Sequence, residues 1–82
     1  MASKQAVVLI PSLHPDDRLT AYVRDLVAHG FEHIVVVDDG SGPDYASYFD
    51  ELRANPACEV LSYPDNRGKG FALKFGMQHI LR

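Results

Sequence analysis

Three short apolar runs, each stopped by turn-forming residues, constrain the fold of this 82-residue chain more than any other feature. The runs cover residues 6–10, 34–37 and 58–63, and the first two contain only aliphatic side chains. A short, unbroken apolar run is typical of a strand that is covered on both faces of a sheet. We therefore predict three buried strands.

Helical periodicity fills the segments between and after these runs. The first helix is predicted from apolar residues at helical spacing, with acidic residues at its start and Gly30 as its left-handed cap. The second helix precedes Asn55-Pro56, and the third follows residue 70. The inward residues are expected to be Leu19, Tyr22, Val23, Leu26 and Val27 in the first helix, Tyr45, Tyr48, Phe49 and Leu52 in the second, and Phe75 in the third. The third helix also carries Ala72, Met77, His79, Ile80 and Leu81.

The predicted order β-α-β-α-β-α indicates a three-layer α/β fold with a parallel sheet and right-handed crossovers. Residues 1–82 contain no repeat or linker, so we expect one domain. The last helical pattern reaches Arg82 without an obvious cap, and we expect more sheet beyond it. A chain of this length buries only a little over roughly 60% of its unfolded surface, which predicts marginal stability.

Charge and cysteine content exclude several classes of protein. The net charge is −3, without a basic footprint for nucleic acid, so no nucleic-acid partner is expected. The single Cys58 is expected to be a buried structural thiol, as in a reducing compartment. No apolar run approaches the roughly 18 residues of a membrane span, and no signal peptide is recognisable. We expect a cytoplasmic protein, with membrane association left open for a longer parent.

Polar residues and glycines concentrate in three loops that follow the predicted strands, at residues 11–15, 38–43 and 64–70. Parallel strands end at the same edge of their sheet, and ligands bind beyond that edge. Asp38 and Asp39 could accept hydrogen bonds from a base or a ribose, with Gly40 allowing a ligand close to the backbone. Alternatively, either carboxylate caps the next helix or closes an Asx turn.

The third loop, residues 66–70, places a lysine between two glycines at the start of a predicted helix. Amides and a cation in that position could hold a diphosphate, although a tight turn with solvated basic residues is the alternative. The loop is not a Walker A motif, because no Ser or Thr follows Lys69. No Gly-x-Gly-x-x-Gly follows the first strand, so the dinucleotide fingerprint is also absent.

Taken together, these segments resemble the family 2 glycosyltransferases. The resemblance rests on Val-Val-Leu-Ile-Pro at 7–11, Val-Val-Val-Asp-Asp-Gly-Ser at 35–41, and Asn-Arg-Gly-Lys-Gly-Phe-Ala at 66–72 with Gly76. The third segment looks most like the dolichol- and polyprenyl-phosphate sugar transferases. The resemblance implies that the chain is the N-terminal, nucleotide-binding portion of a GT-A fold, a Rossmann-like half-sheet. Its ligand would be a nucleotide-diphosphate sugar of the UDP or GDP type.

The resemblance also implies roles for individual residues. Pro11, Ser12 and Leu13 would line the base, and Asp39 would contact the base or ribose with Asp38 and Ser41 beside it. Arg67 and Lys69 would lie near the base or the diphosphate, in a loop shaped by Asn66, Gly68 and Gly70. Leu13 and His14 stand where the family commonly has an aromatic residue and an asparagine, so the aromatic stacking on a base is lost.

The family's catalytic parts are not in this chain. Its metal-binding Asp-x-Asp follows a fourth strand, and its catalytic base comes later still. The parent enzyme is therefore expected to use Mg²⁺ or Mn²⁺, whereas this chain lacks the metal ligands and no catalytic residue is assigned. Asp38-Asp39 follows the second strand and is not that motif.

Two further hypotheses compete with the glycosyltransferase reading. The chain could be a non-catalytic α/β interaction module with a vestigial site. Its exposed sheet edge or uncovered apolar faces could then form a homodimer. A response-regulator receiver is disfavoured, because its acidic pair would follow the first strand rather than the second.

Overall fold

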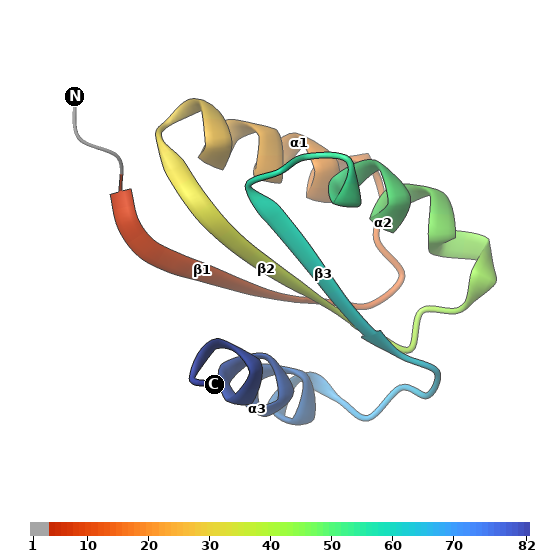
Figure 1. The fold of residues 1–82 in the computed structure, drawn as a ribbon. Coiled ribbons are helices and arrows are strands. Elements are labelled where there is room, and N and C mark those ends of the chain that lie inside the picture. Colours follow the sequence, from red (N-terminus) through yellow and green to blue (C-terminus); the bar gives the residue numbers. More distant parts are fainter. Residues whose placement is uncertain (1–3) are drawn as a thin grey trace.

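Three parallel strands form one sheet in the order β1-β2-β3, with helices on both of its faces (Figure 1). The computed structural model describes residues 4–82. The elements are β1 (Lys4–Ser12), α1 (Asp17–Ala28), β2 (Phe31–Asp39), the 3-10 turn η1 (Pro43–Tyr45), α2 (Ala46–Arg53), β3 (Cys58–Tyr63) and α3 (Lys69–Ile80). The predicted α/β class and parallel sheet are therefore confirmed. No helix in the described part of the chain has the length and apolar content needed to cross a membrane.

The register of the sheet brings the carboxyl ends of the strands level with one another. Residues 7–12 of β1 lie opposite residues 33–38 of β2, and residues 34–39 of β2 lie opposite residues 58–63 of β3. Asp38 is thus flanked by Ser12 and Ser62, while Asp39 lies opposite Tyr63. The three loops that follow the strands consequently start from one edge.

Successive side chains of β2 supply two separate cores, because neighbouring residues of a strand point to opposite faces. On the face covered by α1 and α2, the buried residues are Val23, Ile34, Val36, Phe49, Leu52 and Cys58. The other face is covered by α3 alone, where Val35 and Val37 pack with Ala72. This double burial explains why the β2 sequence is continuously apolar rather than alternating.

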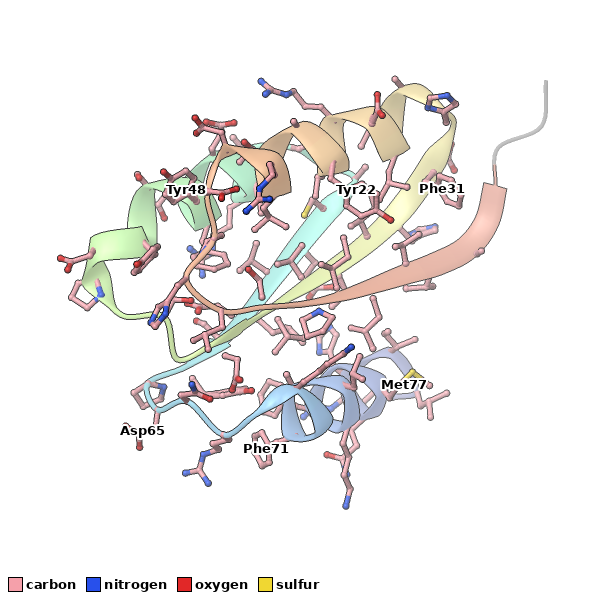
Figure 2. The ribbon with its side chains drawn as sticks, turned by 180° about the vertical axis from the view of Figure 1, so that it is seen from behind. Tyr22, Phe31, Tyr48, Asp65, Phe71 and Met77 are labelled. Carbon is pink, nitrogen blue, oxygen red and sulfur yellow. The ribbon has the colours of Figure 1, made fainter. Side chains whose placement is uncertain are left out.

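Helix α1 follows the predicted chemistry at both ends. The Asp16 side chain accepts a hydrogen bond from the Arg18 amide at 2.9 Å, and Gly30 follows the helix with φ +95°. One expectation is wrong: Tyr22 is 53% exposed, although its spacing suggested a core position. The buried stripe of α1 is centred on Thr20 and Val23, so Tyr22 lies beyond its edge. Figure 2 shows Tyr22 with the other side chains.

Helix α3 approaches the sheet closely at Gly76. A β-carbon built there would collide with the Leu9 side chain and would lie 3.0 Å from Val37 Cγ2. The space that a larger residue would occupy is thus already filled by the sheet. Gly70, in the first turn of the same helix, has no such neighbour within 4 Å.

These two glycines give a matched test of the α3–sheet contact. Gly76→Val should lower the free energy of unfolding by about 1–3 kcal/mol, because it overpacks the contact with Leu9 and Val37. Gly70→Val adds the same atoms in open space and should change it by less than about 0.5 kcal/mol. Urea unfolding of both variants measures the difference, and equal effects would show that α3 can move away from the sheet.

Candidate functional site

A pocket of about 570 Å³ opens at the carboxyl end of the sheet. It is lined by residues from all three elements that converge there: Pro11, Ser12, Leu13, Asp39, Asn66, Gly68 and Lys69. Every one of these residues belongs to the set predicted from the sequence. The structure therefore gathers the first loop, the end of β2 and the start of α3 around one space.

Asp39 is the central polar residue of this pocket. Its side chain points to the α3 face of the sheet and is buried, with only 4% exposed. Asp39 Oδ1 accepts hydrogen bonds from the Tyr63 hydroxyl at 2.6 Å and from the Arg67 amide at 2.9 Å. Asp39 Oδ2 accepts one from the Gly68 amide at 3.0 Å. The carboxylate thus joins β2 to the end of β3 and to the third loop.

These hydrogen bonds change the acidity of both side chains. The Tyr63 hydroxyl, followed by the two amides, holds the pKa of Asp39 below its ordinary value, because donors favour the charged form. Desolvation and the neighbouring Asp39 carboxylate raise the pKa of Tyr63. At neutral pH the pair therefore consists of a carboxylate acceptor and a phenol donor.

The third loop differs from the predicted diphosphate cradle. Two of its amides, those of Arg67 and Gly68, already donate to Asp39. The Arg67 guanidinium lies over the Phe71 ring, 5.2 Å from its centroid, and neither Arg67 nor Gly70 lines the pocket. Lys69 is the cationic residue from this loop that does line it.

Asp38 and Asp39 do not act as a pair, because adjacent strand residues point to opposite faces. Asp38 Oδ1 accepts a hydrogen bond from the Ser41 amide at 2.9 Å, which closes an Asx turn. Asp38 lies beside a different hollow, with Ser62 and Pro64. For Asp38, the structure shows the Asx turn that the sequence offered as the alternative to ligand binding.

Ser41 holds the first loop against the second instead of lining the pocket. Its hydroxyl accepts a hydrogen bond from the His14 amide at 2.9 Å, and Ser41 is 7% exposed. His14 has φ +51°, and its ring stacks on Tyr45 with centroids 4.9 Å apart. His14 is therefore turned toward η1, and Leu13 supplies the pocket wall.

Gly40 serves a different purpose from the one its sequence context suggested. A β-carbon there would collide with the backbone of Asp65 and Asn66, and its φ is +68°. The close approach that glycine permits is thus to the third loop, not to a ligand. All three loops are consequently fixed to one another.

Tyr63 was not among the predicted site residues, although its hydroxyl orients Asp39. The sequence carried a usable signal, because Tyr63 ends β3 in register with Asp39. Its ring also packs edge-on against Phe71 and Phe75, with centroids 5.2 and 5.1 Å away. Tyr63 thereby connects the pocket to the start of α3.

The described residues do not fit a divalent metal at this pocket. Asp39 is engaged by three donors, and Asp38 points to the opposite face of the sheet. Nowhere in residues 4–82 do three or more His, Cys, Asp or Glu side chains group so as to hold a metal ion. We therefore derive no chemistry through a metal from this chain.

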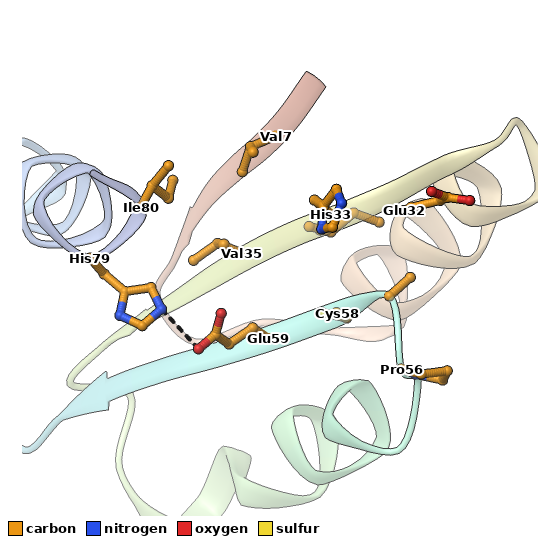
Figure 3. Close-up of a pocket in the computed structure, with 11 residues that line it drawn as sticks. Val7, Glu32, His33, Val35, Pro56, Cys58, Glu59, His79 and Ile80 are labelled. Atoms are coloured by element: carbon orange, nitrogen blue, oxygen red, sulfur yellow. Dashed lines mark ion pairs between the residues drawn. The ribbon is translucent and has the colours of Figure 1, made fainter. Parts of the chain in front are cut away.

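A second hollow, of about 300 Å³, lies at the amino end of the sheet (Figure 3). Across it, His79 Nε2 and Glu59 Oε2 lie 2.8 Å apart and join α3 to β3. Desolvation raises the pKa of the Cys58 thiol to about 11, so the thiol there is protonated and unreactive at neutral pH. This hollow offers no activated nucleophile, and ligands of parallel sheets bind at the opposite end.

Comparisons of the chain with protein-family models, with curated proteins and with solved structures gave no match.

The contact between the second and third loops predicts a strong effect at Gly40. Gly40→Ala should lower the free energy of unfolding by at least about 2–4 kcal/mol, since it adds left-handed strain and a backbone collision. Gly42 also has a positive φ, of +91°, but open space around it. Gly42→Ala should cost only the strain, about 1–2 kcal/mol. Equal losses in thermal or urea unfolding would contradict the proposed collision.

The hydrogen bonds to Asp39 predict a distinct dependence of stability on pH. Because the pKa of Asp39 is below its ordinary 3.8 in the folded chain, the ionised carboxylate stabilises the fold above about pH 4. That stabilisation should be lost as the pH falls through the lower, folded-state pKa. Asp39→Asn should have a lower free energy of unfolding at neutral pH. It should also lack this part of the loss of stability in acid.

Urea unfolding at a series of pH values between neutrality and strong acid measures this effect. Asp44→Asn is the control, because the Asp44 carboxylate accepts no hydrogen bond from any described residue and is exposed. That variant should lose stability in acid to the same extent as the parent chain. If Asp39→Asn and the parent lose stability in parallel, the Asp39 bonds do not contribute as described.

Proposed function

We propose that the pocket binds the nucleoside diphosphate part of a nucleotide sugar. The observation that carries this proposal is the convergence of an apolar wall, a buried carboxylate and a lysine at the carboxyl edge of a parallel sheet. Such an edge is where α/β sheets bind nucleotides. The three groups suit, in turn, a base, its hydrogen-bond donors and an anionic phosphate.

The chemistry of each wall supports this ligand. Pro11 and Leu13 offer an apolar surface to a planar ring. Asp39 Oδ1 already accepts two hydrogen bonds, but Oδ2 accepts only one and can take a second from a base N–H or a ribose hydroxyl. The second acceptor position of Oδ2 therefore orients the ligand.

The phosphates would lie at the beginning of α3. The Ala72 amide is the first of α3 to donate to a preceding carbonyl, that of Gly68, at 3.0 Å. The amides of Lys69 and Gly70 come before it, at the positive end of the helix dipole. Together with the Lys69 ammonium group, they favour an anion over a neutral ligand.

The resemblance to family 2 glycosyltransferases supports the same proposal and extends it to the parent enzyme. In that interpretation the sheet is the nucleotide-binding half of a GT-A fold, and the complete enzyme transfers a sugar to an acceptor. The described residues hold neither a fitting metal site nor a candidate base at the pocket. We therefore propose that the isolated chain binds the nucleotide without transferring the sugar.

A second candidate is a non-catalytic interaction module with a vestigial site. It is favoured by the Asp39 carboxylate, which acts as an internal anion for two amides of the third loop. A loop that satisfies its own donors has less need of a bound phosphate.

Titration with UDP, GDP and the matching nucleosides, followed by amide NMR shifts, tests the proposal. The shifts should concentrate at residues 11–13, 39 and 66–70. Lys69→Ala should weaken binding of the diphosphates about tenfold or more, because a charged hydrogen bond contributes about 1.5–3 kcal/mol. Binding of the uncharged nucleosides should change little.

Lys74→Ala is the matched control. Lys74 is also an exposed lysine of α3, but it lies outside the pocket. Its replacement should therefore leave the affinities for the diphosphates and for the nucleosides unchanged. The absence of shifts at millimolar nucleotide would contradict nucleotide binding and leave the interaction module. Equal losses in Lys69→Ala and Lys74→Ala would show that the helix attracts phosphate by net charge alone.

A further inference from the structure

Charge is strongly segregated along this chain. All eleven acidic residues lie within residues 1–65, whereas residues 66–82 hold four of the eight basic residues and no acidic one. The basic set of this last segment is Arg67, Lys69, Lys74 and Arg82. The net charge of −3 is therefore the sum of a basic C-terminal segment and an acidic remainder.

The basic segment also carries exposed apolar side chains on the outer face of α3. Phe71 is 41% exposed, Met77 46% and Leu81, directly after the helix, 75%. Ala72 and Gly76 occupy the sheet side of the helix and are buried. Lys74 is exposed and lies at helical spacing with Met77 and Leu81 (Figure 2 labels Phe71 and Met77). We refer to Phe71, Lys74, Met77 and Leu81 as the α3 ridge.

The opposite layer of the molecule has the complementary features. A groove of about 510 Å³ runs between α1 and α2. Its lining includes the buried residues Val23 and Leu52 and the charged residues Arg24 and Glu51. Arg18 and Arg53 in this layer are neutralised by ion pairs with Asp16 and Asp50, whereas Arg24 has no ion pair among the described residues. The acidic residues of this layer without an ion pair among the described residues are Asp17, Asp25, Asp44 and Glu51.

These two surfaces cannot meet within one molecule, because the sheet separates them (Figure 1). A two-fold pair of α3 ridges would bring two basic segments together, with no acidic residue of either segment between them, which is unfavourable. A contact between the ridge of one copy and the groove of the next instead joins opposite charges. It also covers Phe71, Met77 and Leu81 of the ridge, which would otherwise remain in water.

We propose that a second copy of this chain is the partner of the α3 ridge, bound head to tail in the α1–α2 groove. Lys74 then faces Glu51, the acidic residue that α2 contributes to the lining of the groove, whereas Arg24 comes from α1. Such a contact is heterologous, so each bound copy still offers one free ridge and one free groove. Association should therefore increase steadily with concentration and weaken with salt.

Charge reversal on either surface tests this geometry by analytical ultracentrifugation from micromolar to millimolar protein. Lys74→Glu and Glu51→Lys should each remove concentration-dependent association. An equimolar mixture of the two variants should associate again in alternation, because the ridge of each variant is then opposite in charge to the groove of the other. The double variant K74E/E51K should associate again, since the opposite charges are restored.

Two controls separate this contact from loss of folding or a change of net charge. Circular dichroism and urea unfolding should give the parent fold for each variant. Glu32→Lys makes the same charge change at an exposed residue outside both surfaces and should associate like the parent. A parent chain that stays monomeric at every concentration would overturn the proposal. So would association retained in Glu51→Lys, which would indicate a two-fold contact between ridges.

Discussion

The Asp39 carboxylate connects parts of the chain that are far apart in the sequence. It accepts hydrogen bonds from Tyr63, at the end of the third strand, and from the amides of Arg67 and Gly68. A buried charge is tolerated only when such donors surround it. Because Asp39 ends the central strand, the strand, the third loop and the start of α3 take their positions from one side chain. The shape of the pocket follows from that arrangement.

The two faces of the sheet are held by different means. On one face, α1 and α2 pack through large side chains such as Phe49 and Leu52 around Val23, Ile34 and Val36. On the other, α3 sits close to the strands because Gly76 leaves room for Leu9 and Val37. The second face buries fewer large residues, and the outer side of α3 carries the exposed side chains of Phe71 and Met77.

The fold could be predicted from the sequence because the relevant signals are local. Apolar runs, helical spacing and caps such as Asp16 and Gly30 act within a few residues, and the structure agrees with them. The pocket residues were also identified, since parallel strands must end at one edge. What could not be predicted depends on contacts across the fold. The exposure of Tyr22, the direction of Asp38, the internal hydrogen bonds of Asp39 and the role of Gly40 all depend on which segment lies opposite.

The contacts that join the three loops also decide where this pocket can change. Ser41 connects the second loop to the first through a hydrogen bond, and Gly40 packs against the backbone of the third. Asp39 connects the third loop to the sheet through hydrogen bonds. An exchange of any one loop would disturb the other two, so loop grafting is a poor route to new ligands here. Leu13 and Lys69 line the pocket but have no side-chain hydrogen bond to another described residue. Those two side chains are the positions at which the shape and charge of the pocket can be altered without rebuilding the scaffold.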